Sequence, residues 1–136
     1  MAEMYKKQTR VLVVDDNRDT ATSLAHLLNL AGFDAEACFD GWAALIAADR
    51  FRPDACVVDI HMPGMDGYEL ARRFRERSPD RPPVLATATG YGDDAHLDLA
   101  AAAGFDLHFS KPTDVSAMAE QLAECVREQA RHCWYG

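Results

Sequence analysis

Five polar residues of the chain have side chains suited to phosphoryl-transfer chemistry: Asp15, Asp16, Asp59, Thr89 and Lys111. Each of them closes, or directly follows, a run of apolar residues of the kind that forms a buried strand. A carboxylate at the end of such a strand needs a partner or a role, because burying an unpaired charge is costly. These residues are therefore the first candidates for a functional site.

If the five side chains meet, their chemistry is specific. Three carboxylates in one small space repel one another, and the ammonium group of Lys111 offsets one charge at most. The remaining charge favours a hard cation such as Mg²⁺, which binds one or two carboxylates together with phosphate oxygens. Thr89 and Lys111 can donate hydrogen bonds to phosphoryl oxygens. Since aspartate forms aspartyl-phosphate intermediates, the set predicts metal-assisted phosphoryl transfer onto Asp59.

The chain reads as a strand followed by a helix, repeated five times. The expected strands cover residues 10–16, 33–39, 54–59, 82–89 and 105–110. The first helix has Ala21, Leu24, Leu28 and Ala31 at helical spacing, and Gly32 at its exit. The second is capped by Asp40 and has Trp42, Leu45 and Ile46 as apolar positions. The third and fourth cover 68–77 and 93–104. The last begins at Thr113 or Asp114, with Val115, Met118, Ala119, Leu122 and Val126 on one face.

This alternation predicts an α/β fold that positions the five polar residues. Alternating strands and helices form a parallel sheet with helices on both faces and right-handed connections. All strands of such a sheet point the same way, so their carboxyl ends share one rim, where ligands bind in this class. We therefore expect Asp15, Asp16, Asp59, Thr89 and Lys111 to gather at that rim.

Composition limits the classes of function. The chain has 136 residues, of which 49% are apolar and 26% are charged. A chain of this length can form one hydrophobic core but not two. Its net charge of -8 disfavours binding to nucleic acid or anionic membranes, and no segment approaches the ~20 apolar residues of a membrane span. Residues 1–10 lack the apolar core of a secretion signal, so we expect a cytoplasmic protein. The cysteines show no metal-ligand spacing, and we expect no disulfide.

The motifs resemble the receiver domain of bacterial two-component response regulators. The matching segments are "VLVVDDN", "VVDIHMPGMDGYEL", "ATGYG" and "AGFDLHFSKP". The spacings between Asp16, Asp59, Thr89 and Lys111 also agree with the family, and the last of them selects Thr89 over Thr87. The resemblance covers residues 9–130, which leaves an N-terminal extension of 1–8 and a tail of 131–136. It implies a flavodoxin-like, doubly wound sheet of five parallel strands in the order 2-1-3-4-5.

The resemblance also implies a role for each matching residue. Asp59 is the expected phosphoacceptor. Asp16 and Asp15 are expected Mg²⁺ ligands, together with Asp59 and the backbone carbonyl of His61. Thr89 is the expected switch hydroxyl, and Lys111 pairs with a phosphoryl oxygen. His108 falls on the position of the switch aromatic, which is usually Tyr or Phe, and so departs from the family pattern.

The implied function is a phospho-accepting switch rather than a turnover enzyme. The phosphoryl group would come from a sensor histidine kinase or a phosphotransfer protein, and hydrolysis would reset the switch. A downstream protein would read the face formed by the fourth helix, the fifth strand and the last helix; a homodimer stays open. His61 and Tyr91 flank the expected path of the attacking water, and we predict that they tune the lifetime of the phosphate.

Two rival functions fit the residues less well. A phosphatase of the haloacid-dehalogenase class needs a second aspartate two residues after the nucleophile, where this chain has His61. A flavin or nucleotide binder needs backbone amides after the first strand to hold phosphate, where this chain has two acids. Within the receiver family, "GYGDD" and "AGFDLHFSKP" favour a module from a hybrid kinase. The initial Met and the lack of an output domain favour a free-standing regulator.

Overall fold

The computed structural model describes residues 8–89, 104–110 and 114–135, with only the backbone described for residues 89, 110 and 130–135. Several predictions of the sequence analysis lie outside the described residues. They are residues 93–103 of the predicted fourth helix, the side chain of Thr89, and the residues Tyr91 and Lys111.

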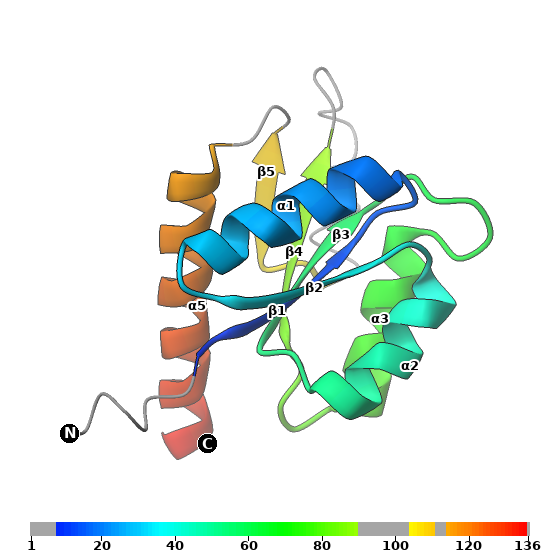
Figure 1. Cartoon of the computed structure of the whole chain (residues 1–136). Helices are drawn as coiled ribbons and strands as arrows, with labels where there is room; N and C mark the ends of the chain where they lie inside the picture. The colour runs from blue at the N-terminus through cyan, green and yellow to red at the C-terminus, as the bar shows by residue number, and fades with distance from the viewer. Residues whose placement is uncertain (1–7, 90–103, 111–113, 136) are drawn as a thin grey trace.

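A five-stranded parallel sheet forms the centre of the molecule (Figure 1). Its strands are β1 (Arg10–Val14), β2 (Asp34–Cys38), β3 (Ala55–Asp59), β4 (Val84–Thr89) and β5 (Leu107–Ser110). They lie in the order β2-β1-β3-β4-β5, and every neighbouring pair is parallel. This order confirms the predicted fold class and places β1 and β3 side by side at its centre.

Helices cover both faces of the sheet (Figure 1). They are α1 (Arg18–Leu30), α2 (Gly41–Phe51), α3 (Gly67–Arg77) and α5 (Val115–Tyr135). Helices α1 and α5 pack on one face, over a core that includes Val11 and Val13. Helices α2 and α3 pack on the other, over a core that includes Leu12 and Val14. Successive residues of β1 thus enter different cores, which explains why its sequence is apolar throughout rather than alternating.

Side-chain caps start the helices on the described part of the chain. The capping residues are Asn17 for α1, Asp40 for α2, Asp66 for α3 and Asp114 for α5, and each accepts a hydrogen bond from a backbone N–H in the first turn. The prediction of Asp40 is confirmed, and Asp114, one of the two residues expected to start the last helix, caps α5. Gly32 follows α1 with a φ of 103°, a left-handed conformation that favours glycine and confirms the predicted helix exit.

The sequence analysis was wrong about the buried side of α2. Leu45 is buried as expected, but Trp42 is 57% exposed and Ile46 is 74% exposed. The helix instead turns Gly41, Ala44, Leu45 and Phe51 toward the sheet. Trp42 and Ile46 are four residues apart, so both fall on the side that faces away from the sheet.

One element boundary also differs from that expected. Strand β4 begins at Val84 rather than at residue 82, because Pro82 and Pro83 have no N–H to donate to a ladder. Helix α5, for which the sequence analysis gave no end, continues to Tyr135. None of the helices in the described ranges is both long enough and apolar enough to cross a membrane.

Candidate functional site

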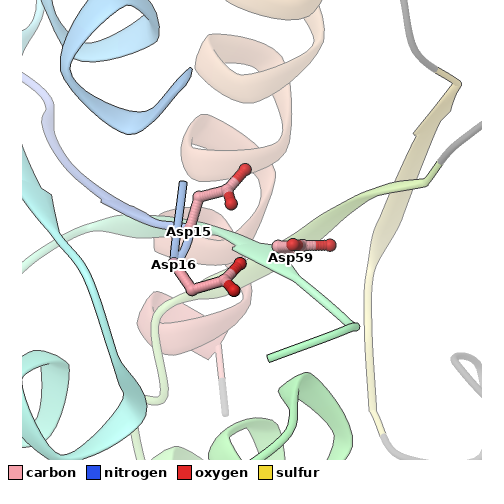
Figure 2. Close-up of side chains that lie close together, drawn as sticks. All are labelled: Asp15, Asp16 and Asp59. Atoms are coloured by element: carbon pink, nitrogen blue, oxygen red, sulfur yellow. The ribbon is translucent and has the colours of Figure 1, made fainter. Parts of the chain in front are cut away.

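Three aspartates meet at the carboxyl ends of β1 and β3 (Figure 2). Asp15 and Asp16 follow the last residue of β1, and Asp59 is the last residue of β3. The two strands are neighbours, with Val14 opposite Val58, so the acids that follow them are brought side by side. Carboxylate oxygens of all three residues lie within 4.8 Å of one another. The structure thus brings together the three acids that the sequence analysis selected.

Backbone N–H groups hold two of the acids in place. Asp15 is buried, and its own N–H continues the ladder by donating to the carbonyl of Cys38 at 3.1 Å. Its Oδ1 accepts a hydrogen bond from the N–H of Asn17 at 3.0 Å, a local turn of the kind that aspartate favours. The Oδ1 of Asp59 accepts one from the N–H of His61 at 3.3 Å. The carboxylates are therefore oriented by the strand ends themselves.

Gly67, the first residue of α3, packs against the backbone of Asp59. Its N–H donates to the carbonyl of Ile60 at 3.0 Å. A Cβ added at Gly67 would lie 2.8 Å from both the carbonyl oxygen of Asp59 and the Cα of Ile60. Only glycine allows this approach. The start of α3 therefore fixes the position of the strand end that presents Asp59, a contact that the sequence analysis did not identify.

The structure distinguishes the two threonines of β4. Thr87 is fully buried, and its hydroxyl donates to the carbonyl of Val58 at 2.9 Å. Its hydroxyl thus links β4 to β3 inside the sheet, as expected for a structural strand residue. Thr89 lies two residues further on, at the end of β4, opposite Ser110 of β5. Its backbone is therefore at the same rim as the three acids.

The two histidines of interest lie in different surroundings. His61 is exposed in the loop after β3, with its N–H donated to Asp59 as described above. His108 is half-buried in β5, opposite Thr87 of β4. The position expected for the switch residue is thus within the sheet, next to the strand that ends at Thr89.

The acid cluster has the electrostatics of a cation site. Two like charges about 4 Å apart repel by about 1 kcal/mol in bulk water, and by more where the surroundings are less polar. All three groups of the cluster offer oxygen, the donor that hard divalent cations prefer, and one of them is exposed enough to keep water in the shell. The residues present therefore fit Mg²⁺ or a similar ion.

A mainly apolar groove of about 430 Å³ lies beside the acid cluster. Its lining includes Asp15 and Asp59, Leu24 and Leu27 of α1, and Val115 at the start of α5. Leu27 is 43% exposed although it is a large apolar residue. The sequence analysis did not identify this groove, because it depends on how α1 lies relative to β3.

Comparison with known proteins identifies the family. The model of the response regulator receiver domain matches residues 11–123, most of the chain. The chain belongs to this family. Receiver domains are the phospho-accepting switches of two-component signalling, and they interact with histidine kinases and with downstream effector domains. Neither rival function, the dehalogenase-type phosphatase or the flavin binder, finds support in the comparisons.

Curated relatives of this receiver domain are longer than the chain. It is 36% identical over 120 residues to the transcriptional regulatory protein PrrA of Mycobacterium tuberculosis, covering 88% of this chain and 51% of PrrA. It is 37% identical over 122 residues to the response regulator MprA of Mycobacterium avium, covering 87% of this chain and 51% of MprA. The chain therefore spans about half the length of these relatives.

Solved receiver structures have the same fold. A CheY-like receiver domain protein from Methanospirillum hungatei superposes with a TM-score of 0.82 at 24% identity, covering 93% of this chain and 99% of that one. The chemotaxis protein CheY4 of Vibrio cholerae gives a TM-score of 0.79 at 26% identity, covering 87% of this chain and 98% of that one. The predicted receiver fold is confirmed.

Proposed function

We propose that this receiver domain accepts a phosphoryl group on Asp59 and changes its binding to a partner protein in response. The observation that supports the proposal most strongly is the acid cluster, in which Asp59 ends a buried strand with two further carboxylates within 4.8 Å. A stable fold gains nothing from such crowding, since the groups repel one another. A site for a cation and a phosphoryl group explains it.

Asp15, Asp16 and Asp59, with the backbone carbonyl of His61, would hold Mg²⁺. When bound, the ion supplies charge neutralisation for the phosphoryl group that is transferred. The chain's own contribution is to orient the carboxylates through the N–H groups of Asn17 and His61. Because these contacts exist before any phosphoryl donor arrives, the acids need no reorganisation at the moment of reaction.

In the proposed reaction a carboxylate oxygen of Asp59 attacks phosphorus in line with the leaving group. A P–O bond forms, and the P–N bond of a phosphohistidine breaks, with the electron pair returning to the imidazole. Lys111 and Thr89 are the proposed donors to the phosphoryl oxygens. The phosphate adds about -1.5 to -2 charge at the rim. Hydrolysis of the acyl phosphate then resets the domain, so it is not a turnover enzyme.

The groove beside Asp59 suits a helical phosphoryl donor. Asp59 is among its lining residues, together with apolar residues of α1 that include Leu24 and the partly exposed Leu27. A helix of a histidine kinase or phosphotransfer protein could place its apolar face there and present its histidine to Asp59. A kinase partner of this kind would place the domain in the cytoplasm.

The proposed output surface consists of residues 93–104, β5 and α5. Bonding of Thr89 to the phosphoryl group would change this surface through the segment after β4, with His108 in β5 as the switch residue. Moving a two-state equilibrium from 1:99 to 99:1 requires about 5.5 kcal/mol. Several charge-assisted hydrogen bonds to one phosphoryl group supply energy of that order.

The test is phosphorylation by a small phosphodonor such as acetyl phosphate with Mg²⁺, followed by intact mass. We expect wild type to gain the mass of one PO₃ group and Asp59→Asn to gain none. Asp54→Asn is the matched control, because Asp54 lies at the other end of the same sheet; we expect it to be phosphorylated like wild type. An equal mass gain in wild type and Asp59→Asn would refute the proposal.

The lifetime of the phosphate gives a second measurement. We propose that His61 and Tyr91 affect the approach of the water that hydrolyses the acyl phosphate. Dephosphorylation rates of His61→Ala and Tyr91→Ala are then expected to differ from that of wild type. Unchanged rates in both variants would show that neither residue acts on the water.

A further inference from the structure

The groove of about 430 Å³ beside the acid cluster is lined by apolar side chains from both the sheet and the helices. Those from the strands include Val13 of β1 and Val57 of β3, and those from the helices are Leu24 and Leu27 of α1 and Val115 of α5. Apolar surface that stays in contact with water is costly, and an apolar ligand removes that cost by covering it. The composition of the lining therefore favours a ligand with an apolar body.

The proposed phosphoacceptor, Asp59, is itself one of the residues that line this groove. The lining residues of α1 run from Asp19 to Leu27, so the lining follows that helix for roughly 12 Å. A phosphodonor that reacts with Asp59 therefore shares the groove with a long stretch of α1. Binding of its non-reacting part can then be used to raise the rate of transfer, because that part is held where the phosphoryl group reacts.

The charged groups in the groove indicate which class of donor it suits. Among the described lining residues these groups are all carboxylates, those of Asp15, Asp19 and Asp59. A phosphate ester usually needs a proton for its leaving alcohol, and an ammonium or imidazolium group to supply one is not among them. An acyl phosphate needs no proton, since its leaving group is stable as a carboxylate. The three negative charges also repel that carboxylate product and favour its release.

We propose that, among small phosphodonors, this groove selects acyl phosphates with an apolar chain of several carbons over acetyl phosphate. The inference rests on the proposed phosphorylation of Asp59. A carboxylate oxygen of Asp59 forms a bond to phosphorus, and the bond between phosphorus and the acyl oxygen breaks. The electron pair leaves with that oxygen as a carboxylate. The acyl chain lies against Leu24 and Leu27. The hydroxyls of Thr20 and Ser23, which also line the groove, are suited to donate to the acyl carbonyl oxygen.

The experiment compares acetyl, butyryl and hexanoyl phosphate, which have the same reacting group and differ only in chain length. The full chain is mixed with Mg²⁺ and each donor far below saturation, and the gain of PO₃ is followed by intact mass, which distinguishes it from acylation of lysine. Each methylene that enters the groove should raise the rate about fourfold. We therefore expect hexanoyl phosphate to react at least ~10-fold faster than acetyl phosphate. Asp59→Asn should gain no PO₃ from any of the three donors.

Variants of α1 test whether the groove causes the preference, through the ratio of the hexanoyl to the acetyl rate. Leu27→Ser replaces apolar lining surface by a hydroxyl and should lower this ratio, whereas Leu27→Met keeps the surface apolar and should preserve it. Leu30→Ser is the matched control, because Leu30 is a 72% exposed residue of α1 that is not among the lining residues, and the ratio should not change. Circular dichroism checks that each variant is folded.

The outcomes separate this inference from the proposed function. Equal rates with the three donors in wild type would overturn the inference alone, since Asp59 would still be phosphorylated. A preference for hexanoyl phosphate that Leu27→Ser leaves unchanged would also overturn it, because the groove would then not be its cause. No gain of PO₃ from any donor would refute the proposed function and the inference with it.

Discussion

The aspartates at the two ends of the sheet have different kinds of neighbour. At the carboxyl ends of the strands, Asp15, Asp16 and Asp59 lie next to one another, with oxygens within 4.8 Å. At the amino ends, aspartates lie next to arginines and strand N–H groups. Asp54 accepts a hydrogen bond from the N–H of Arg10 at 2.9 Å, and Asp106 accepts one from that of Leu85 at 2.9 Å.

Arginines complete the arrangement at the amino ends. Arg10 forms an ion pair with Asp34 at 3.8 Å, and Arg75 forms one with Asp106 at 3.7 Å. Arg75 also donates two hydrogen bonds, from Nε and Nη2, to the carbonyl of Gly104, at 3.2 and 2.7 Å. These acids satisfy backbone groups where strands begin, which is a structural role.

The difference teaches how to separate stability from function in this fold. An acid whose neighbours are donors lowers the free energy of the folded state, because it satisfies groups that would otherwise lose their hydrogen bonds to water. An acid whose neighbours are other acids raises the free energy of the folded state until a cation binds. Substitutions at the two ends should therefore change stability with opposite signs.

The largest expected effect comes from a substitution at Gly67, where the start of α3 packs against the end of β3. Gly67→Ala would place a Cβ 2.8 Å from the backbone of Asp59 and Ile60, and neither can move without distorting β3. We expect a loss of about 3 kcal/mol in the free energy of unfolding, measured with urea, and slower phosphorylation. Gly41→Ala is the control, because its Cβ would meet the flexible side chain of Met65, and a smaller loss is expected. Equal losses would mean that the contact with Asp59 is not special.

A loss of about 2 kcal/mol is expected for Asp106→Ala at the amino end. The change removes the acceptor of the Leu85 N–H and the ion-pair partner of Arg75. Asp80→Ala, at an exposed aspartate, should change stability by less than about 0.5 kcal/mol. Phosphorylation of Asp106→Ala should continue. If it stopped while stability stayed unchanged, the structural role assigned to this end would be wrong.

Asp16→Asn, at the carboxyl ends of the strands, is expected to change stability in the opposite direction from Asp106→Ala. Without metal, the variant should be more stable than wild type by about 1 kcal/mol, since one repulsive charge is removed. Added Mg²⁺ should then raise the melting temperature of wild type and have little effect on the variant, by linkage between binding and folding. Thermal unfolding with and without Mg²⁺ measures both. A variant less stable than wild type without metal would contradict the repulsion argument.

The smallest effect concerns Cys38, whose carbonyl accepts the N–H of Asp15. Burial, with Glu36 and Asp40 nearby, raises the pKa of its thiol from 9.0 to about 11. The folded state therefore holds the thiol proton more tightly than the unfolded state. Its contribution to stability is complete below pH 9 and is lost as the pH rises toward 11.

Urea unfolding between these pH values tests this contribution. We expect stability to fall with rising pH and Cys38→Ala to show a shallower slope. The slope should not vanish, because burial also raises the pKa of Cys56. An identical slope in wild type and Cys38→Ala would show that the thiol of Cys38 ionises equally in both states.

The sequence by itself determined the sheet, its rim and the acids that gather there. Runs such as 11–14 and 55–58 are apolar at every position, which predicts strands buried on both faces, and the acids that follow them then share one rim. The choice of Thr89 over Thr87 was also available from spacing. In the structure the hydroxyl of Thr87 is bonded within the sheet, and the role of Thr89 stays a prediction. These features depend on neighbouring residues or on regular spacing, so the pattern of residues along the sequence is enough to predict them.

Only the tertiary structure decided which side of α2 is buried and what lies against Asp59. Helix α2 is apolar on both sides, with Ala44 and Leu45 on one and Trp42 and Ile46 on the other, so periodicity alone could not choose between them. Packing on the sheet made the choice and left Trp42 outside. The approach of Gly67 to Asp59 likewise depends on how α3 meets the end of β3. Such contacts depend on the positions of whole elements in space, which no spacing along the chain specifies.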